Sequence, residues 1–336
     1  MIEKTGHVPV LLNEVINVLE PKPMKTYIDA TFGNGGYSRK ILETSDCNVI
    51  AIDRDPMVIN QANKFKDEYQ ERFEFFNYKF SQLDNLLESL STKNIDGFVF
   101  DLGVSSMQID NQDRGFSFQN DGKLDMRMSQ NGLTAEEIIN EYSETDLADI
   151  IFQYGDERKS RKIAKKIVSE RINKRITSTI ELAKIVSSCF VKKYYKSHPA
   201  TKTFQAIRIF VNKEIEELID GLNTATKFLA ENGKLCIVTF HSIEDRIVKN
   251  FFKITGSKNY ISNENKENLL FNLKNKPIKP SDKEISDNRR SRSAKLRFGI
   301  RNFNNSKLIS PNELGFVCLL YTSPSPRDKR QSRVPG

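Results

Sequence analysis

The stretch Tyr27-Ile-Asp-Ala-Thr-Phe-Gly-Asn-Gly-Gly-Tyr37, followed by Ala51-Ile-Asp-Arg-Asp55, decides the expected fold. The first apolar run ends in a glycine-rich turn, residues 38–42 look helical, and the second apolar run ends in an acid. This order predicts a βαβ unit of an open α/β sheet, with a ligand crevice at the carboxyl ends of its strands. Asp53 follows Gly33 by 20 positions, a spacing that suits a carboxylate on an adenosine ribose. The unit therefore predicts an adenosine-containing ligand.

Two adenosine ligands compete for this loop: a dinucleotide such as NAD, and S-adenosylmethionine. A dinucleotide fingerprint reads G-x-G-x-x-G, but position 38 here is serine. Asp29 precedes the loop, where it would repel a pyrophosphate but would suit an ammonium or sulfonium group. The alternative role of Asp29 is to cap the loop backbone. These residues favour S-adenosylmethionine.

Length and composition limit the domain organisation, the cellular compartment and the partners that we expect. With 336 residues, an α/β core leaves room for a further domain or large insertion. The four cysteines show no metal or redox spacing, so we expect a cytoplasmic protein without a metal site. No apolar run approaches the ~20 residues that cross a bilayer, and we expect neither a membrane span nor a signal peptide. The net charge of +8 and the pI near 9.1 admit a nucleic-acid partner.

Strand and helix patterns alternate along the first hundred residues and then stop. The expected helices and strands cover residues 56–69 (helix), 73–80 (strand), 82–90 (helix) and 96–104 (strand). From about 108 to 200 only helical patterns occur, and a strand pattern resumes at 234–240. We therefore expect a helical insertion between the fourth and fifth strands of the sheet.

Three further patterns describe the second half of the chain. Apolar residues from Phe204 to Ala225 recur every three or four positions, which predicts one continuous helix packed on the sheet. Asn232-Gly233 predicts a turn before the fifth strand. Residues 295–301 alternate charged and apolar side chains, which suits an edge strand.

Positive charge gathers in two clusters that could neutralise phosphates. The first comprises Arg158, Lys159, Arg161, Lys162, Lys165, Lys166, Arg171, Lys174 and Arg175. The second comprises Arg289, Arg290, Arg292, Lys295, Arg297 and Arg301. Acidic neighbours make the first cluster equally compatible with a solvated helix face, whereas acids are sparse near the second. Residues 274–293 look like a flexible loop that orders on RNA.

Longer motifs occur in a fixed order along the chain. They are His7–Glu14, Asp29–Gly36, Ala51–Pro56, Asp101–Gln108, Arg114–Phe118, Leu124–Met128, His198–Gln205 and Phe240–Arg246. By these motifs the chain resembles the bacterial small-subunit ribosomal RNA (cytosine-1402-N4)-methyltransferase family, also called RsmH or MraW. The resemblance implies an α/β fold: a Rossmann-like class I S-adenosylmethionine methyltransferase sheet with an inserted helical domain.

The resemblance also implies a set of residues that bind S-adenosyl-L-methionine. They are Gly35, Gly36, Tyr37, Asp53, Phe80, Asp101 and Gln108. The loop ending at Tyr37 would surround the methionine end, and Asp53 would accept the ribose hydroxyls. Phe80, at the end of the third strand, would lie against adenine. Asp101 and Gln108 would reach the cofactor from the fourth strand and the loop after it.

The implied reaction is transfer of a methyl group to the exocyclic nitrogen of a cytidine, without a metal. The lone pair of this nitrogen is delocalised into the ring, so an acceptor for its N–H is needed. Asp101, the carbonyls of Leu102 and Gly103, and His241 are candidate acceptors, and the catalytic residue stays open. Arg114 and Arg208 are candidate RNA contacts with an equally plausible structural role, and Arg289, Arg290 and Arg292 are candidates from the second cluster.

The expected domains are a discontinuous methyltransferase core at 1–107 and 201–305, a substrate-recognising helical insertion at 108–200, and a disordered tail at 306–336. Residues 317–336 resemble translated adapter sequence more than a protein tail and are set aside. The expected substrate is 16S ribosomal RNA, either free or within the small ribosomal subunit. The alternatives are a methyltransferase that acts on DNA or protein, and a non-enzymatic RNA-binding factor.

Overall fold

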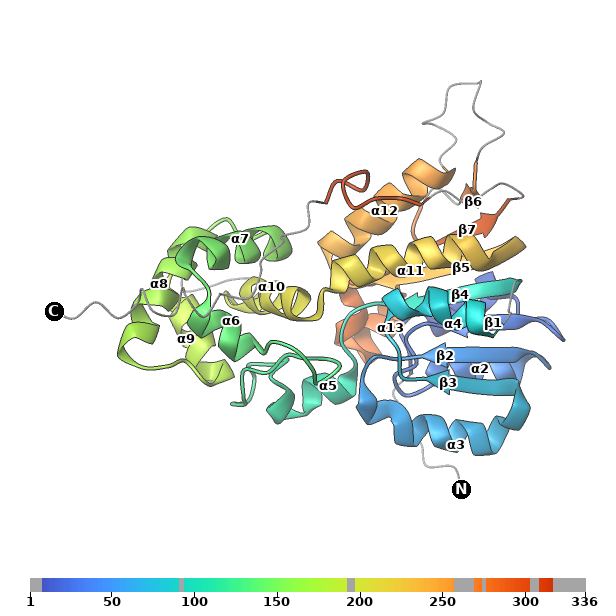
Figure 1. Cartoon of the computed structure of the whole chain (residues 1–336), viewed down its shortest axis with the longest axis horizontal. Coiled ribbons are helices and arrows are strands. Elements are labelled where there is room, and N and C mark those ends of the chain that lie inside the picture. Colours follow the sequence, from blue (N-terminus) through green and yellow to red (C-terminus); the bar gives the residue numbers. More distant parts are fainter. Residues whose placement is uncertain are drawn as a thin grey trace. The chain divides into compact units, whose positions relative to one another are not determined.

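A computed structural model describes residues 8–90, 94–191, 197–256, 269–273, 276–302 and 308–316 (Figure 1). Of the predicted disordered tail at 306–336, residues 308–316 are described and bury Ile309 and Phe316, whereas residues 317–336 lie outside the described residues. Within them the chain forms two compact units, the first from residues 8–103 and 215–316 and the second from residues 104–214. These limits differ from the predicted limits after residues 107 and 200, so α10, described below, belongs to the helical unit.

The first unit is built on a mixed sheet, which in the described residues has the strand order β3-β2-β1-β4-β5-β7-β6. The strands are β1 (Thr26–Asp29), β2 (Asn48–Ile52), β3 (Phe73–Phe76), β4 (Ile95–Asp101), β5 (Leu229–Thr239), β6 (Phe271–Leu273) and β7 (Lys295–Arg301). The first five pair in parallel, and β7 runs antiparallel to both β5 and β6. The predicted α/β fold class is confirmed.

Helices cover both faces of this sheet (Figure 1). They are α1 (Leu12–Leu19), α2 (Gly36–Thr44), α3 (Ile59–Tyr69), α4 (Leu83–Ser89), α11 (Glu214–Phe228), α12 (Ser242–Gly256) and α13 (Asp282–Asp287). Successive residues of β4 point to opposite faces. Gly97 faces Leu19 of α1, whereas Phe100 packs against Gly221 of α11. Phe98 and Phe100 are fully buried and form part of the hydrophobic core on the face of the sheet that α11 covers.

The second unit is helical in its described part. Its helices are α5 (Ser106–Asp110), α6 (Ala135–Glu141), α7 (Glu144–Gly155), α8 (Ser160–Asn173), α9 (Thr179–Ser188) and α10 (Thr201–Asn212). Thr134 and Glu137 form a capping box that starts α6, and Ser143 caps α7. No strand occurs between β4 and β5 in the residues described, in agreement with the predicted helical pattern.

The continuous helix predicted from Phe204 to Ala225 is wrong, because the chain breaks at Lys213. Lys213 adopts a left-handed conformation with φ 49°, which ends α10 before α11 begins. The buried Asn212 side chain donates to the Met126 carbonyl and accepts from the Met128 N–H, both at 2.7 Å. The apolar spacing continues across the break because both helices bury an apolar face. The face of α10 packs on α7, and the face of α11 packs on the sheet.

Other local expectations also change. The strand β7 is not an edge strand, because the three-residue β6 pairs with its outer side. The β-prone run 73–80 is a strand only to Phe76, and Phe80 begins a 3-10 turn before α4. Asn232 adopts φ 63° within an irregular pairing of β5, so the predicted turn is a distortion inside the strand. Over the described parts of the chain, no helix is both long and apolar enough to cross a membrane.

Candidate functional site

The carboxyl ends of β2, β1 and β4 lie next to one another, because these strands are parallel neighbours. Asp29 ends β1, Asp53 directly follows β2, and Asp101 ends β4. The Asp101 backbone N–H donates to Thr31 Oγ1 at 2.8 Å, which ties β4 to the turn after β1. In an open α/β sheet, this edge is where ligands bind.

Asp53 is joined to the glycine loop by a direct hydrogen bond. The Gly33 N–H donates to Asp53 Oδ2 and the Asp55 N–H donates to Asp53 Oδ1, both at 2.8 Å. Each carboxylate oxygen retains a further acceptor position for a ribose hydroxyl. Asp53 therefore holds the loop in place, a role that the sequence did not reveal.

The environment of Asp53 disfavours its charged form. Burial raises the pKa of Asp53 to about 6, although the backbone N–H groups of Asp55 and Gly33 act in the opposite direction. A protonated carboxyl accepts fewer hydrogen bonds than a carboxylate, so the ribose contact predicted for Asp53 favours the ionised form.

We therefore expect cofactor affinity to fall as the pH drops through about 6. If only ionised Asp53 binds, the dissociation constant at pH 5 is about tenfold higher than at pH 7. Calorimetric titration over this range measures the effect. Asp53→Asn has no titrating carboxyl at this position and must flatten the profile. An unchanged profile in the variant would assign the pH dependence to another group.

Asp29 performs the structural role that the sequence left as an alternative. It is fully buried, and Oδ2 accepts from the Ser38 N–H at 3.1 Å and the Ser38 hydroxyl at 2.6 Å. Its Oδ1 accepts from the Thr31 N–H at 3.1 Å. Burial raises the pKa of Asp29, since desolvation outweighs these hydrogen bonds. Asp29 thus braces both ends of the glycine loop.

The loop residues predicted to surround the methionine end are closely packed on their protein side. Gly35 has φ 79°, and a Cβ there would lie 2.3 Å from Phe65 Cζ. The buried Tyr37 side chain donates its hydroxyl to the Val10 carbonyl. The Tyr37 hydroxyl is thus engaged by protein, and a cofactor contact at this position falls to the backbone.

The remaining predicted cofactor residues are placed as follows. Phe80 is partly exposed and meets Phe100 edge-on, with ring centroids 5.2 Å apart. Asp101 Oδ1 is buried without a hydrogen-bond partner among the described residues. Burial, reinforced by Asp29 and Glu244, raises the pKa of Asp101 well above its usual range. Gln108 lies in the second unit, where its side chain accepts from the Ser105 N–H to cap α5.

His241 follows β5, the strand beside β4. Its Nδ1 accepts from the Glu244 N–H at 3.4 Å, and its Nε2 lies 2.9 Å from Glu244 Oε1. The buried Glu244 also accepts from the Phe240 N–H at 2.9 Å. Glu244 therefore orients His241. No role was predicted for Glu244 from the sequence, although Glu244 lies inside the matched motif at 240–246.

The flexible loop predicted at 274–293 is wrong for its described part, residues 276–293. Ser281 caps α13 by accepting the Glu284 N–H, and Asn288 caps the following 3-10 turn, Arg289–Ser293. The turn presents exposed arginines at 289, 290 and 292. The candidate RNA contacts from this cluster are thus held on ordered backbone.

The rest of the second cluster has structural partners. Lys295 and Arg297 both pair with Asp245 of α12, at 2.7 and 2.8 Å. Arg301 is buried and donates to the Leu270 and Asn302 carbonyls. One acid that is distant in sequence, Asp245, therefore pairs with two members of this cluster.

The side chains of Arg114 and Arg208 form hydrogen bonds within the second unit. The buried Arg114 donates from Nη2 to the Arg127 and Met128 carbonyls, both at 2.9 Å. Arg208 forms a two-pronged pair with Glu214, with both nitrogen–oxygen distances 2.8 Å. These contacts account for both side chains structurally, and their RNA role stays a prediction.

The first basic cluster also contains paired members. Lys166 pairs with Glu170, and Arg175 with Glu136. Arg171 donates to backbone carbonyls at the end of α6 and just beyond it. These contacts favour the solvated helix face over a phosphate-binding surface.

A sheet in this order with an antiparallel β7, a glycine loop after β1 and an acid after β2 defines a class I methyltransferase. Its cofactor is S-adenosyl-L-methionine, as predicted. The MraW methylase family matches residues 4–301, and the chain belongs to this family. The resemblance found in the sequence is thereby confirmed.

Two relatives illustrate the match. Ribosomal RNA small subunit methyltransferase H of Rickettsia bellii (strain OSU 85-389) is 53% identical over 299 residues, covering 87% of this chain and 97% of that protein. The protein of the same name from Rickettsia conorii (strain ATCC VR-613 / Malish 7) is 50% identical over 300 residues, with the same coverage. Among solved structures, an rRNA methylase from Streptococcus thermophilus aligns with 88% of this chain and 99% of its own length, at 12% identity and a TM-score of 0.39.

Proposed function

We propose that this chain methylates the exocyclic N4 amine of a cytidine in 16S ribosomal RNA, position 1402 by family resemblance. Family membership and the small-subunit rRNA methyltransferase names of relatives at 50–53% identity support the substrate. The observation that carries the proposal is the carboxyl edge of the sheet, where the loop-bound Asp53 after β2 and the buried Asp101 Oδ1 at the end of β4 lie on either side of β1.

The reaction requires that the cytidine nitrogen be positioned against the methyl group and that an acceptor bind its N–H. Bound S-adenosyl-L-methionine supplies an electrophilic methyl group, and its sulfur departs as a neutral thioether. The cytidine nitrogen gains a bond to the methyl carbon and must release one proton. Asp101 Oδ1 and the Glu244-oriented ring of His241 are the candidate groups that hold this N–H. An acceptor that is already held in place makes the lone pair of the cytidine nitrogen more available. The protein then does not have to rearrange during the reaction.

Two variants separate these acceptors. Asp101→Ala and His241→Ala each remove one candidate, and the true acceptor is the residue whose loss lowers kcat at saturating RNA and cofactor. Steady-state assays of methyl transfer measure kcat, while calorimetry confirms that the cofactor still binds. If neither variant lowers kcat, a backbone carbonyl such as that of Leu102 or Gly103 becomes the acceptor.

Substrate recognition is assigned to two places. We infer that the second unit recognises the RNA around the target cytidine, and that Arg289, Arg290 and Arg292 contact its phosphates. These three side chains are exposed on an ordered turn, which suits phosphate contacts made without prior folding. A ribosomal RNA substrate implies action in the cytoplasm, on free RNA or on the small subunit.

Nucleoside mass spectrometry tests the proposal. Purified 16S RNA and small ribosomal subunits are each incubated with the protein and methyl-labelled S-adenosyl-L-methionine, then digested to nucleosides. Labelled N4-methylcytidine is the expected product, and the better substrate of the two identifies the physiological form. Label at another base position overturns the N4 assignment. Label only in added DNA or protein, or no label at all, overturns the proposed function.

A further inference from the structure

A short N-terminal segment, residues 8–11, lies against the glycine loop. Pro9 packs so closely on Gly36 that a Cβ on Gly36 would lie 2.3 Å from Pro9 Cγ. The next residue, Val10, is buried and accepts the Tyr37 hydroxyl at its carbonyl oxygen. The segment therefore fixes the part of the loop that carries two predicted cofactor residues.

The segment turns into α1 through an unfavourable backbone conformation. Leu11 has φ 57° and ψ 28°, a left-handed geometry that crowds the Cβ of any residue other than glycine. It makes no side-chain cap for α1. Such a conformation persists only where surrounding contacts hold it. The Leu11 N–H finds its partner 273 positions away, at Glu284 Oε1, at a distance of 2.7 Å.

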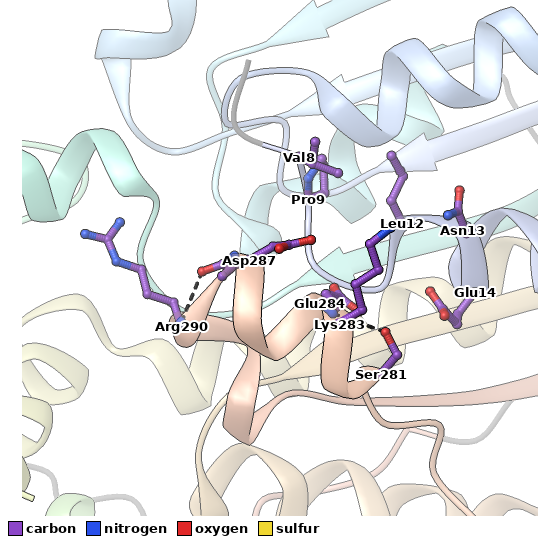
Figure 2. A pocket seen from close by; sticks show the side chains of 11 residues that line it. Val8, Pro9, Leu12, Asn13, Glu14, Ser281, Lys283, Glu284, Asp287 and Arg290 are labelled. Atoms are coloured by element: carbon purple, nitrogen blue, oxygen red, sulfur yellow. Dashed lines mark hydrogen bonds between the residues drawn. The ribbon is translucent and has the colours of Figure 1, made fainter. Parts of the chain in front are cut away.

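Glu284 makes this contact beside a pocket with a volume of about 630 Å³ (Figure 2). Residues between 8 and 14 line one wall, and residues between 281 and 290 line the other. Figure 2 shows Glu284 on α13 near Leu12, with Val8 and Pro9 on the opposing segment. The hydrogen bond from Leu11 to Glu284 therefore links this segment to the element that forms the other wall.

We propose that Glu284 is a positioning residue for the cofactor. By accepting the Leu11 N–H, it keeps Pro9 and Val10 against Gly36 and Tyr37. Glu284 acts through residues 8–11 and not by contact with the cofactor. The inference rests on the proposed placement of S-adenosyl-L-methionine at the glycine loop. Without this hydrogen bond the segment relaxes, the loop loses its support, and the cofactor binds more weakly.

Three variants test the proposal by calorimetric binding of S-adenosyl-L-methionine to the full chain. Glu284→Ala removes the acceptor and weakens binding about 3- to 10-fold. Glu284→Gln retains an acceptor oxygen and restores binding to within about twofold of the original protein. Asp282→Ala, at an exposed acid in the first turn of the same helix, is the matched control and leaves binding unchanged. In steady-state assays, Glu284→Ala raises KM for the cofactor and leaves kcat unchanged.

A double-mutant cycle with Pro9→Ala distinguishes positioning from general loss of stability. If both residues act through the same segment, the double variant binds the cofactor about as weakly as the weaker single variant. Additive losses overturn the proposal, and so does a Glu284→Ala protein that binds like Asp282→Ala. Should Glu284→Ala fail to fold, Glu284→Asp replaces it in the cycle, because its shorter side chain withdraws the carboxylate from Leu11. The calorimetric binding measurements use no RNA, so they are independent of the proposed substrate.

Discussion

Replacing Asp53 with alanine weakens S-adenosyl-L-methionine binding about 10- to 150-fold. This result is expected if the ionised carboxylate accepts the ribose hydroxyls, because hydrogen bonds to charged groups contribute about 1.5–3 kcal/mol, which corresponds to that range. Removal of the hydrogen bond from the Gly33 N–H adds to the effect, because this bond ties the loop to the end of β2. Isothermal titration calorimetry on the purified variant measures the change.

A cofactor analogue separates the two contributions of Asp53. An analogue that lacks the ribose hydroxyls binds more weakly than the cofactor to the original protein but shows no such difference with Asp53→Ala. Asp67→Ala, at an exposed acid of α3, is the control for the removal of a negative charge. Unchanged affinity in a folded Asp53→Ala protein excludes Asp53 from the cofactor site. An equal penalty for the analogue in both proteins means that Asp53 acts through the loop alone.

Neutralising Arg289, Arg290 and Arg292 together weakens RNA binding strongly and flattens its dependence on salt. Each phosphate interaction that the variant removes reduces the slope of log affinity against log salt by about 0.7–0.9, so the three together reduce it by about 2–3. Fluorescence anisotropy with a labelled RNA at several salt concentrations gives both affinity and slope. Cofactor affinity is expected to stay constant, since S-adenosyl-L-methionine has no phosphate.

The control carries the same change in charge. Neutralising Lys22, Lys64 and Lys249, exposed lysines elsewhere in the first unit, removes three positive charges away from the turn after α13. A slope that falls equally in both triple variants indicates a general effect of net charge. Unaltered affinity and slope in the arginine variant make this turn a solvated surface, and the basic helix α8 becomes the better candidate.

The carboxyl-edge site was predictable because its signals are local. An apolar run followed by an acid marks the ends of β1, β2 and β4, and the glycine turn marks the helix that follows β1. The parallel order then brings Asp53 and Asp101 to one edge. The fold class followed from the same alternation.

What the sequence did not reveal depends on distant partners or on small departures from a period. The break at Lys213 leaves the apolar spacing intact, so periodicity alone predicts one helix across it. The edge position of β7 was wrong because only three residues form the outer strand β6, too few for a clear pattern. The ordered helix α13 did have a signal, since Ser281 followed by Glu284 three residues later is typical of a helix start. No local pattern predicts that Glu284 binds the N–H of Leu11.

The internal bracing of the glycine loop has a consequence for how fast the cofactor binds. Asp29 holds Thr31 and Ser38, and Asp53 holds Gly33, so the loop's shape is set by protein hydrogen bonds. A loop that is already shaped loses little conformational entropy when its ligand arrives. We therefore expect association in a single kinetic step whose rate rises linearly with cofactor concentration, without the plateau that a preceding or subsequent rearrangement would impose.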